Sequence, residues 1–211
     1  MKPVLKLFTL FIAISLIFLL SFLLFQENFE ILFNFHACHQ WFMTIKPYAW
    51  LIGILLLLAD LIMPVPATGV LASLGAVYGV LPGALFGTIG SAGAGMLGYG
   101  AARLLGPKVT QLIATRKERE KFKVFFDQWG GYAIIISRIL PLLPEVLTIL
   151  AGISGMKFSK FILALLAGTI PVCFLFAWIG HFSEDTPVFG LLISVLIPVL
   201  LWPLFTKRLK S

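Results

Sequence analysis

Residues 137–145 are Ser137-Arg138-Ile139-Leu140-Pro141-Leu142-Leu143-Pro144-Glu145, so two prolines interrupt an apolar run that has an arginine before them and a glutamate after them. Proline breaks a helix because it lacks an N–H and its ring clashes with the preceding turn. The run therefore predicts two short helices joined by a tip, over 131–143 and 144–156. Each is shorter than the roughly 20 residues that cross a bilayer, which favours a re-entrant hairpin over 131–156.

An earlier stretch has the same form. Asp60 precedes Met63-Pro64-Val65-Pro66, and the apolar segments on either side, 48–62 and 66–79, are again too short to span a membrane. They predict a first re-entrant hairpin over 48–79.

Each hairpin is followed by a longer apolar segment rich in small residues, 83–104 after the first and 158–180 after the second. Gly75 and Gly152 occupy corresponding positions in the two second halves, where a small residue lets helices pack closely. The pattern is a weak internal repeat. Paired, proline-interrupted short segments of this kind indicate the binding site of a transporter.

The composition supports a membrane location. Of 211 residues 60% are hydrophobic and 12% charged, against roughly 45–50% and 25% in soluble domains, and the mean hydropathy is +1.03. These values exclude a soluble enzyme, a nucleic-acid-binding domain, a disordered chain and a disulfide scaffold. We expect an all-α integral membrane protein with about four transmembrane helices plus two facing re-entrant helical hairpins in an inverted repeat.

The expected organisation has three parts. They are an N-terminal spanning helix (7–25) with an external loop, together 1–47; a transport domain, 48–206; and a basic tail, 207–211. The transport domain comprises the hairpin 48–79, the span 83–104, an amphipathic helix 106–129, the hairpin 131–156 and the spans 158–180 and 187–206. Phe122, Phe125, Phe126 and Trp129 recur at helical spacing within 106–129, which predicts an apolar face lying on the bilayer.

Charge assigns a topology to this arrangement. With the N-terminus inside, only Lys46 of the sixteen Lys and Arg residues lies outside, and only Arg138 lies within the membrane. This agreement with the positive-inside rule predicts that both termini are cytoplasmic and that the two hairpins enter from opposite faces.

Three ionisable residues fall in apolar surroundings: Asp60, Arg138 and Glu145. Helix rise places each about 13 to 18 Å from the nearest membrane edge, near the midplane of a hydrocarbon core of about 30 Å. Such residues cost roughly 3 kcal/mol or more at that depth, which predicts a function or a partner for each.

Pro66 and Pro144 suit the first turns of the second half-helices, whose N-termini would point free N–H groups into the centre. Together with Arg138 they predict a substrate-binding site for an anionic group, in which Asp60 and Glu145 couple proton movement. The alternative is that Arg138 simply pairs with Glu145 or Asp60 and holds the tips together.

Two weaker patterns favour ordinary structural roles. The run His36-x-Cys38-His39 contains metal-ligand residue types, but three ligands in four residues suit no common site. The run Gly152-Ile153-Ser154-Gly155, with His181 as a base, matches the motif of rhomboid intramembrane proteases, but His181 lies at a membrane edge. We therefore expect no enzyme, no metal and no cofactor.

The run from Ser137 to Pro144, followed by Ala151-Gly152 and Met156, resembles the DedA / VTT-domain family (SNARE-associated Golgi proteins). Asp60, the Pro64-x-Pro66 tip and Gly75 resemble that family's first hairpin, so the resemblance covers about residues 50–181. It implies that Pro64, Pro141 and the glycines shape the facing hairpins. It also implies that Asp60 and Arg138 take the places of an essential acid and an essential arginine.

The sequence departs from the bacterial DedA pattern at two places. Pro144 stands where that branch has a second arginine, and Ala67-Thr68-Gly69 stand where a second acid is found. The chain therefore looks closer to the VTT branch with proline at that position.

The resemblance implies a proton-dependent transporter or flippase in the bacterial inner membrane, with an anionic lipid such as a polyprenyl phosphate or a phospholipid as substrate. Its expected partners are membrane lipids, the phosphate-bearing substrate and protons, without nucleic acid. The alternatives are a phospholipid scramblase that needs no ion gradient and a non-transporting scaffold.

Overall fold

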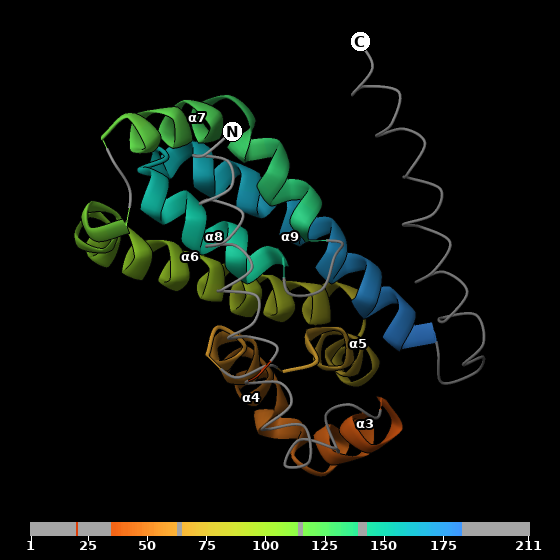
Figure 1. The fold of residues 1–211 in the computed structure, drawn as a ribbon. Helices are drawn as coiled ribbons and strands as arrows, with labels where there is room; N and C mark the ends of the chain where they lie inside the picture. Colours follow the sequence, from red (N-terminus) through yellow and green to blue (C-terminus); the bar gives the residue numbers. More distant parts are fainter. Residues whose placement is uncertain (1–19, 21–34, 63–64, 114–115, 139–142, 183–211) are drawn as a thin grey trace.

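The computed structural model describes residues 20, 35–62, 65–113, 116–138 and 143–182, and within these ranges the structure is helical without strands (Figure 1). The helices, with their bounds, are α3 (Phe35–Thr44), α4 (Lys46–Ala59), α5 (Ala67–Tyr78), α6 (Val80–Ile113), α7 (Arg116–Ser137), α8 (Leu143–Ser154) and α9 (Phe158–Phe182). The expected spans 7–25 and 187–206, and the basic tail, lie outside the described residues.

Two of the described helices are long and apolar enough to cross a membrane, over Val80–Leu105 in α6 and Phe158–Phe182 in α9. They pack against each other along their length, and the remaining helices lie on either side of them (Figure 1). The helices α4, α5 and α8 are apolar but have only 14, 12 and 12 residues. They correspond to the short segments expected from the proline pattern.

The helices α4 and α5 form an antiparallel pair closed at its base. Tyr78, at the end of α5, donates a hydrogen bond to the Lys46 carbonyl oxygen and accepts one of 3.0 Å from the Trp50 N–H, both at the start of α4. Gly79 then has a φ of 88°, a conformation that glycine adopts without strain. This single residue ends the pair, and α6 begins directly after it.

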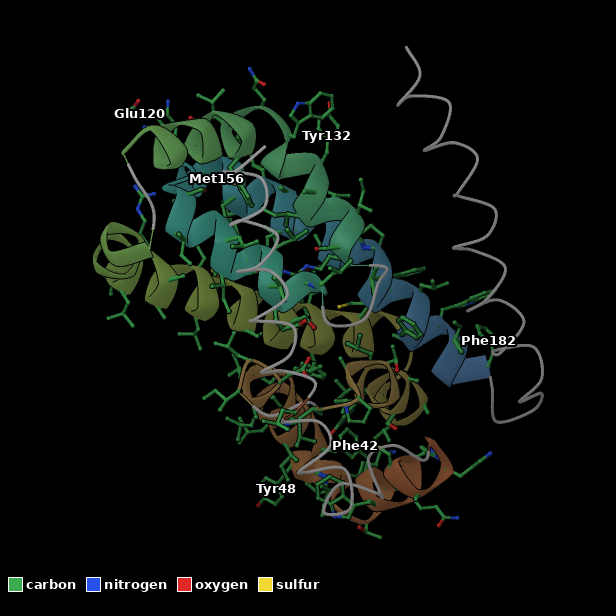
Figure 2. The ribbon with its side chains drawn as sticks, in the orientation of Figure 1. Phe42, Tyr48, Glu120, Tyr132, Met156 and Phe182 are labelled. Carbon is green, nitrogen blue, oxygen red and sulfur yellow. The ribbon has the colours of Figure 1, made fainter. Side chains whose placement is uncertain are left out.

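At the opposite end of the molecule, in the corresponding pair α7–α8, Met156 follows α8 and packs against α7, where a Cβ at Gly130 would lie 3.4 Å from its sulfur. The Tyr99 hydroxyl, on α6, donates a 2.5 Å hydrogen bond to the Met156 carbonyl oxygen in the turn between α8 and α9. Figure 2 shows Phe42 and Tyr48 at one end of the molecule and Met156 and Tyr132 towards the other. The two helix pairs therefore enter the fold from opposite ends.

The helices of the structure differ from the expected boundaries at two places. Residues 35–44 of the expected external loop form α3, because Cys38 and Phe42, one helical turn apart, are fully buried in a cluster with residues of α5. The expected separate helix over 106–129 is divided: α6 continues to Ile113, and α7 runs from Arg116 into the first half of the second hairpin.

The continuity of α7 has a packing reason. Gly130 and Gly131 lie at the expected break, yet a Cβ at Gly130 would lie 2.8 Å from Phe126 Cδ1 and 3.4 Å from the Met156 sulfur. Close packing therefore explains the glycine at 130 without any break in the helix. Phe126 is buried inside the protein and not on a surface that could lie on a bilayer, whereas Trp129, on the same expected face, is exposed.

Candidate functional site

The turn after α4 and helix α8 meet on α6 at Gly98. A Cβ at Gly98 would lie 2.9 Å from Leu61 Cδ1, in the turn after α4, and 3.3 Å from Thr148 Cγ2, on α8. Along α6, the glycines shortly before Gly98 contact α4, and the residues that follow Gly98 contact α8. Arg138, directly after α7, lies beside Gly95, three residues before Gly98, so the described ends of the two turns come together on α6.

Asp60 lies at the first tip. It is the C-cap of α4, and its Oδ1 accepts a 2.9 Å hydrogen bond from the Val65 N–H on the far side of the turn. It also interacts electrostatically with Glu145 and Arg138. Its carboxylate thus closes the turn and faces the second helix pair.

Arg138 lies at the second tip, directly after α7. Its side chain passes between α6 and α9 at two glycines: a Cβ at Gly95 would lie 3.3 Å from Nη2, and a Cβ at Gly168 would lie 2.9 Å from Cγ. Nη2 donates a 3.2 Å hydrogen bond to the Thr148 hydroxyl, and Nε is buried with no hydrogen-bond partner among the described residues.

The carboxylates do not neutralise this guanidinium by direct contact. Among the described residues, no oxygen of Asp60 or Glu145 lies within 4.0 Å of an Arg138 nitrogen, although both groups interact with it electrostatically. In the described part of the chain, the tips are therefore not held together by a direct ion pair of Arg138.

The two second half-helices begin differently. Pro66 is the N-cap of α5, whose start has no side-chain hydrogen bond. Pro144 lies in the first turn of α8, followed there by Glu145. A carboxylate in a first turn compensates the partial positive charge of the helix N-terminus. Charge on Glu145 would therefore weaken the attraction of α8 for an anion.

The expected packing glycines are at close helix contacts. A Cβ at Gly75, on α5, would overlap the Ala177 carbonyl oxygen on α9, and one at Gly152, on α8, would lie 2.5 Å from the Tyr99 carbonyl oxygen on α6. Each short second helix thus packs against the long helix that follows the other pair. Pro64 and Pro141 lie outside the described residues.

Sequence reasoning missed the polar groups around the arginine. Thr148, Ser91 and Cys173 lie on α8, α6 and α9, and Cys173 interacts electrostatically with Arg138. Hydroxyl residues are common in apolar helices, so composition does not distinguish them. The one available signal was that Thr148 lies ten residues after Arg138 across a proline turn.

The two weaker patterns do not form sites. Ser154 Oγ donates to the Ala151 carbonyl oxygen at the Met156 end of the molecule. His181 is separated from it by the length of α9, about 35 Å. Among the described residues, no group of three or more His, Cys, Asp or Glu side chains is arranged to hold a metal ion.

The family model of the VTT domain matches residues 65–182, which is more than half of the chain. The chain belongs to the VTT-domain family. The matched range includes α5 to α9 with Arg138 and Glu145, whereas α4 and Asp60 precede it. No curated protein and no solved structure matched the chain. The match with the VTT-domain model confirms the resemblance expected from the sequence. The VTT domain is the domain of the DedA family, and it is associated with membranes and with transport or lipid-related functions.

Proposed function

We propose that this VTT-domain protein is a proton-dependent transporter or flippase for an anionic lipid or similar amphiphile, such as a polyprenyl phosphate or a phospholipid. The substrate's anionic group binds at the facing tips, with Arg138 as its principal ligand. The protein catalyses no covalent chemistry and needs no cofactor for this activity.

The buried guanidinium of Arg138 is the observation on which this proposal depends. Arginine presents five N–H donors in a planar fork, and the described residues supply one hydroxyl acceptor at Nη2 and none at Nε. Unsatisfied buried donors cost free energy. An anion with several oxygens, such as a phosphate, would satisfy the fork and neutralise its charge.

The charges around the tips support proton coupling. Arg138 contributes one positive charge, and ionised Asp60 and Glu145 contribute two negative charges. Adding a phosphate to a site that is already net negative is unfavourable in a low-dielectric interior. Protonation of the two carboxyl groups would reverse this balance, so the substrate and protons would bind together and be released together.

The arrangement of the helices supports a specific membrane topology. In this proposal α4–α5 and α7–α8 are re-entrant hairpins from opposite faces, related as an inverted repeat, while α6 and α9 span a bacterial inner membrane. The opposite entry of the two pairs and the approach of Leu61 and Thr148 to Gly98 support this topology. The basic residues between 106 and 129 then lie inside with both termini.

A flux assay in liposomes tests the proposal. The full chain is reconstituted, and the movement of a fluorescent polyprenyl phosphate and of fluorescent phosphatidylglycerol between leaflets is followed with and without a pH gradient. We expect net movement only with the gradient. Movement in both directions without a gradient would instead identify a scramblase, and no movement of either lipid would favour a scaffold.

Two matched variants assign this flux to Arg138. Arg138→Lys keeps the positive charge but loses the planar fork, so we expect flux to fall by about tenfold or more. Arg103→Lys is the control, because Arg103 lies at the other end of the second hairpin, where Nη1 donates to the Met156 carbonyl oxygen. Equal flux from both variants would contradict the role proposed for Arg138.

A further inference from the structure

Polar side chains gather where α6 and α9 pack together, although both helices are apolar. Cys173, on α9, is 1% exposed, and its sulfur lies 4.0 Å from the Ser91 hydroxyl oxygen on α6. Its thiol also forms a hydrogen bond with Thr88, one helical turn before Ser91. We call Thr88, Ser91 and Cys173 the polar seam.

The polar seam leads away from Arg138 along α6. A Cβ at Gly87 would lie 3.6 Å from the Cys173 sulfur, and a Cβ at Gly95 would lie 3.3 Å from Arg138 Nη2. Eight residues of helix separate these glycines, or about 12 Å. Cys173 also interacts electrostatically with Arg138, so the seam lies within the field of the guanidinium.

Thr148 adds a second donor beside Arg138. Its hydroxyl oxygen accepts the hydrogen bond from Nη2, and the side chain is 1% exposed. Among the described residues its hydroxyl hydrogen has no acceptor. A hydroxyl that accepts from a cation is polarised and becomes a better donor to an anion.

We propose that Thr148, Ser91 and Cys173 complete the Arg138 site, with Thr148 as a second donor to the bound anion and the polar seam as the route by which the anion reaches Arg138. This inference rests on the anion-binding role proposed for Arg138 above. It identifies Cys173 as a native thiol lining the route, open to modification when the site is open.

Methanethiosulfonate reagents test this proposal because their charge can be varied. The Cys173 thiol loses its proton to water, and the thiolate attacks the sulfenyl sulfur of the reagent. A mixed disulfide forms, the S–SO₂ bond breaks, and methanesulfinate leaves with the electron pair. The reconstituted full chain carries Cys38→Ser, which leaves Cys173 as its one thiol.

The measurement compares an anionic reagent, sulfonatoethyl methanethiosulfonate, with the neutral hydroxyethyl reagent. Each rate at Cys173 is divided by the rate of the same reagent with 2-mercaptoethanol. All labelling is done at a pH low enough to protonate Asp60 and Glu145, so that Arg138 leaves the tips with a net positive charge. We then expect the anionic reagent to be favoured by about tenfold, because a nearby positive charge attracts it in a medium of low dielectric constant. Arg138→Gln should remove the preference, and Arg103→Gln should retain it.

Occupancy of the site gives a second measurement that needs no change at Arg138. Inorganic phosphate, compared with chloride at equal ionic strength, should slow the neutral reagent at Cys173 severalfold. Thr148→Val should remove this protection. Ser154→Ala should keep it, because this buried hydroxyl at the end of the same helix donates to the Ala151 carbonyl oxygen and accepts from the Met156 N–H.

Three results would overturn the proposal. They are a Cys173 that reacts with neither reagent until the chain is unfolded, a charge preference that survives Arg138→Gln, and an absence of phosphate protection. The first result would mean that the seam only joins α6 to α9 by hydrogen bonds. Lipid flux with an inert Cys173 would overturn this inference alone, whereas charge-selective labelling without flux would overturn the transport function alone.

Discussion

At the scale of single residues, mutation can separate two properties of Asp60, the hydrogen bond that its side chain accepts and its ability to bind a proton. Its Oδ1 accepts the Val65 N–H and closes the first tip. Asp60→Asn retains an oxygen acceptor in the same position but cannot take up a proton. If Asp60 couples protons, we expect Asp60→Asn to keep the folded state and to lose the dependence of flux on the pH gradient. Flux and thermal unfolding of the reconstituted variant measure the two effects.

The control for this prediction is Asp60→Ala, which removes the acceptor as well. Loss of the bond to Val65 should lower the free energy of unfolding by about 1–3 kcal/mol, because a backbone N–H loses its partner. An Asp60→Asn variant whose flux still follows the pH gradient would show that Asp60 only closes the turn. Glu145 would then be the remaining carboxyl group at the tips for proton coupling.

Sequence reasoning selected the ionisable residues of the proposed site but not their immediate partners. Asp60, Arg138 and Glu145 were predictable because a charged side chain in an apolar segment is costly and rare. The bond from Arg138 to Thr148 was not, since it depends on the path of the chain through the second turn. The absence of a direct ion pair among the described residues also required coordinates, because spacing alone allows both arrangements.

At the scale of helices, close contacts between backbones set the position of α5 against α9. A Cβ at Gly180 would overlap the Ala72 carbonyl oxygen, so Gly180→Ala must push the two helices apart. We expect this substitution to lower the free energy of unfolding by about 1–3 kcal/mol. Titration with sodium dodecyl sulfate in mixed micelles measures the change.

Gly100→Ala is the matched control on α6. A Cβ at Gly100 meets no atom within 4 Å, and alanine in a helix interior is favoured over glycine by about 0.5–1 kcal/mol. This variant should therefore be equal to or more stable than the unmodified chain. A Gly180→Ala variant as stable as Gly100→Ala would show that the backbones of α5 and α9 separate without cost.

Some helix boundaries could be predicted from the sequence pattern and others could not. Prolines and short apolar lengths predicted α4, α5 and α8 closely, because proline acts locally on the backbone. The join between the amphipathic segment and the second hairpin was missed, since glycine at 130 serves packing against Phe126 and Met156. The pattern gave no sign that α3 would be helical, because its helix depends on burial of Cys38 and Phe42 against α5.

At the scale of the whole molecule, the end at which each helix pair enters the fold determines the side of the membrane from which its tip could be reached. The base of α4–α5, at Tyr48, and the turn that follows α8, at Met156, lie at opposite ends of the molecule (Figure 2). If the two pairs are facing hairpins, as proposed above, Arg138 would be reached from either side when one tip moves relative to the other. Full crossings by α4 and α5 would instead expose the first tip on the far side.

Labelling of single cysteines distinguishes the two topologies. In a chain with Cys38→Ser and Cys173→Ser, we place cysteine at Tyr48, Ile62 or Lys157, whose side chains are exposed in the structure. For re-entrant hairpins, a membrane-impermeant maleimide should label Tyr48→Cys from outside the cell and Lys157→Cys only from inside. Ile62→Cys, at the first tip, should be labelled at least about tenfold more slowly from either side, because the tip lies near the middle of a hydrocarbon core about 30 Å thick.

Labelling of Ile62→Cys from inside as fast as Lys157→Cys would show that α4 and α5 cross the bilayer. The tips would then not meet at its centre, and the proposed midplane site would be wrong.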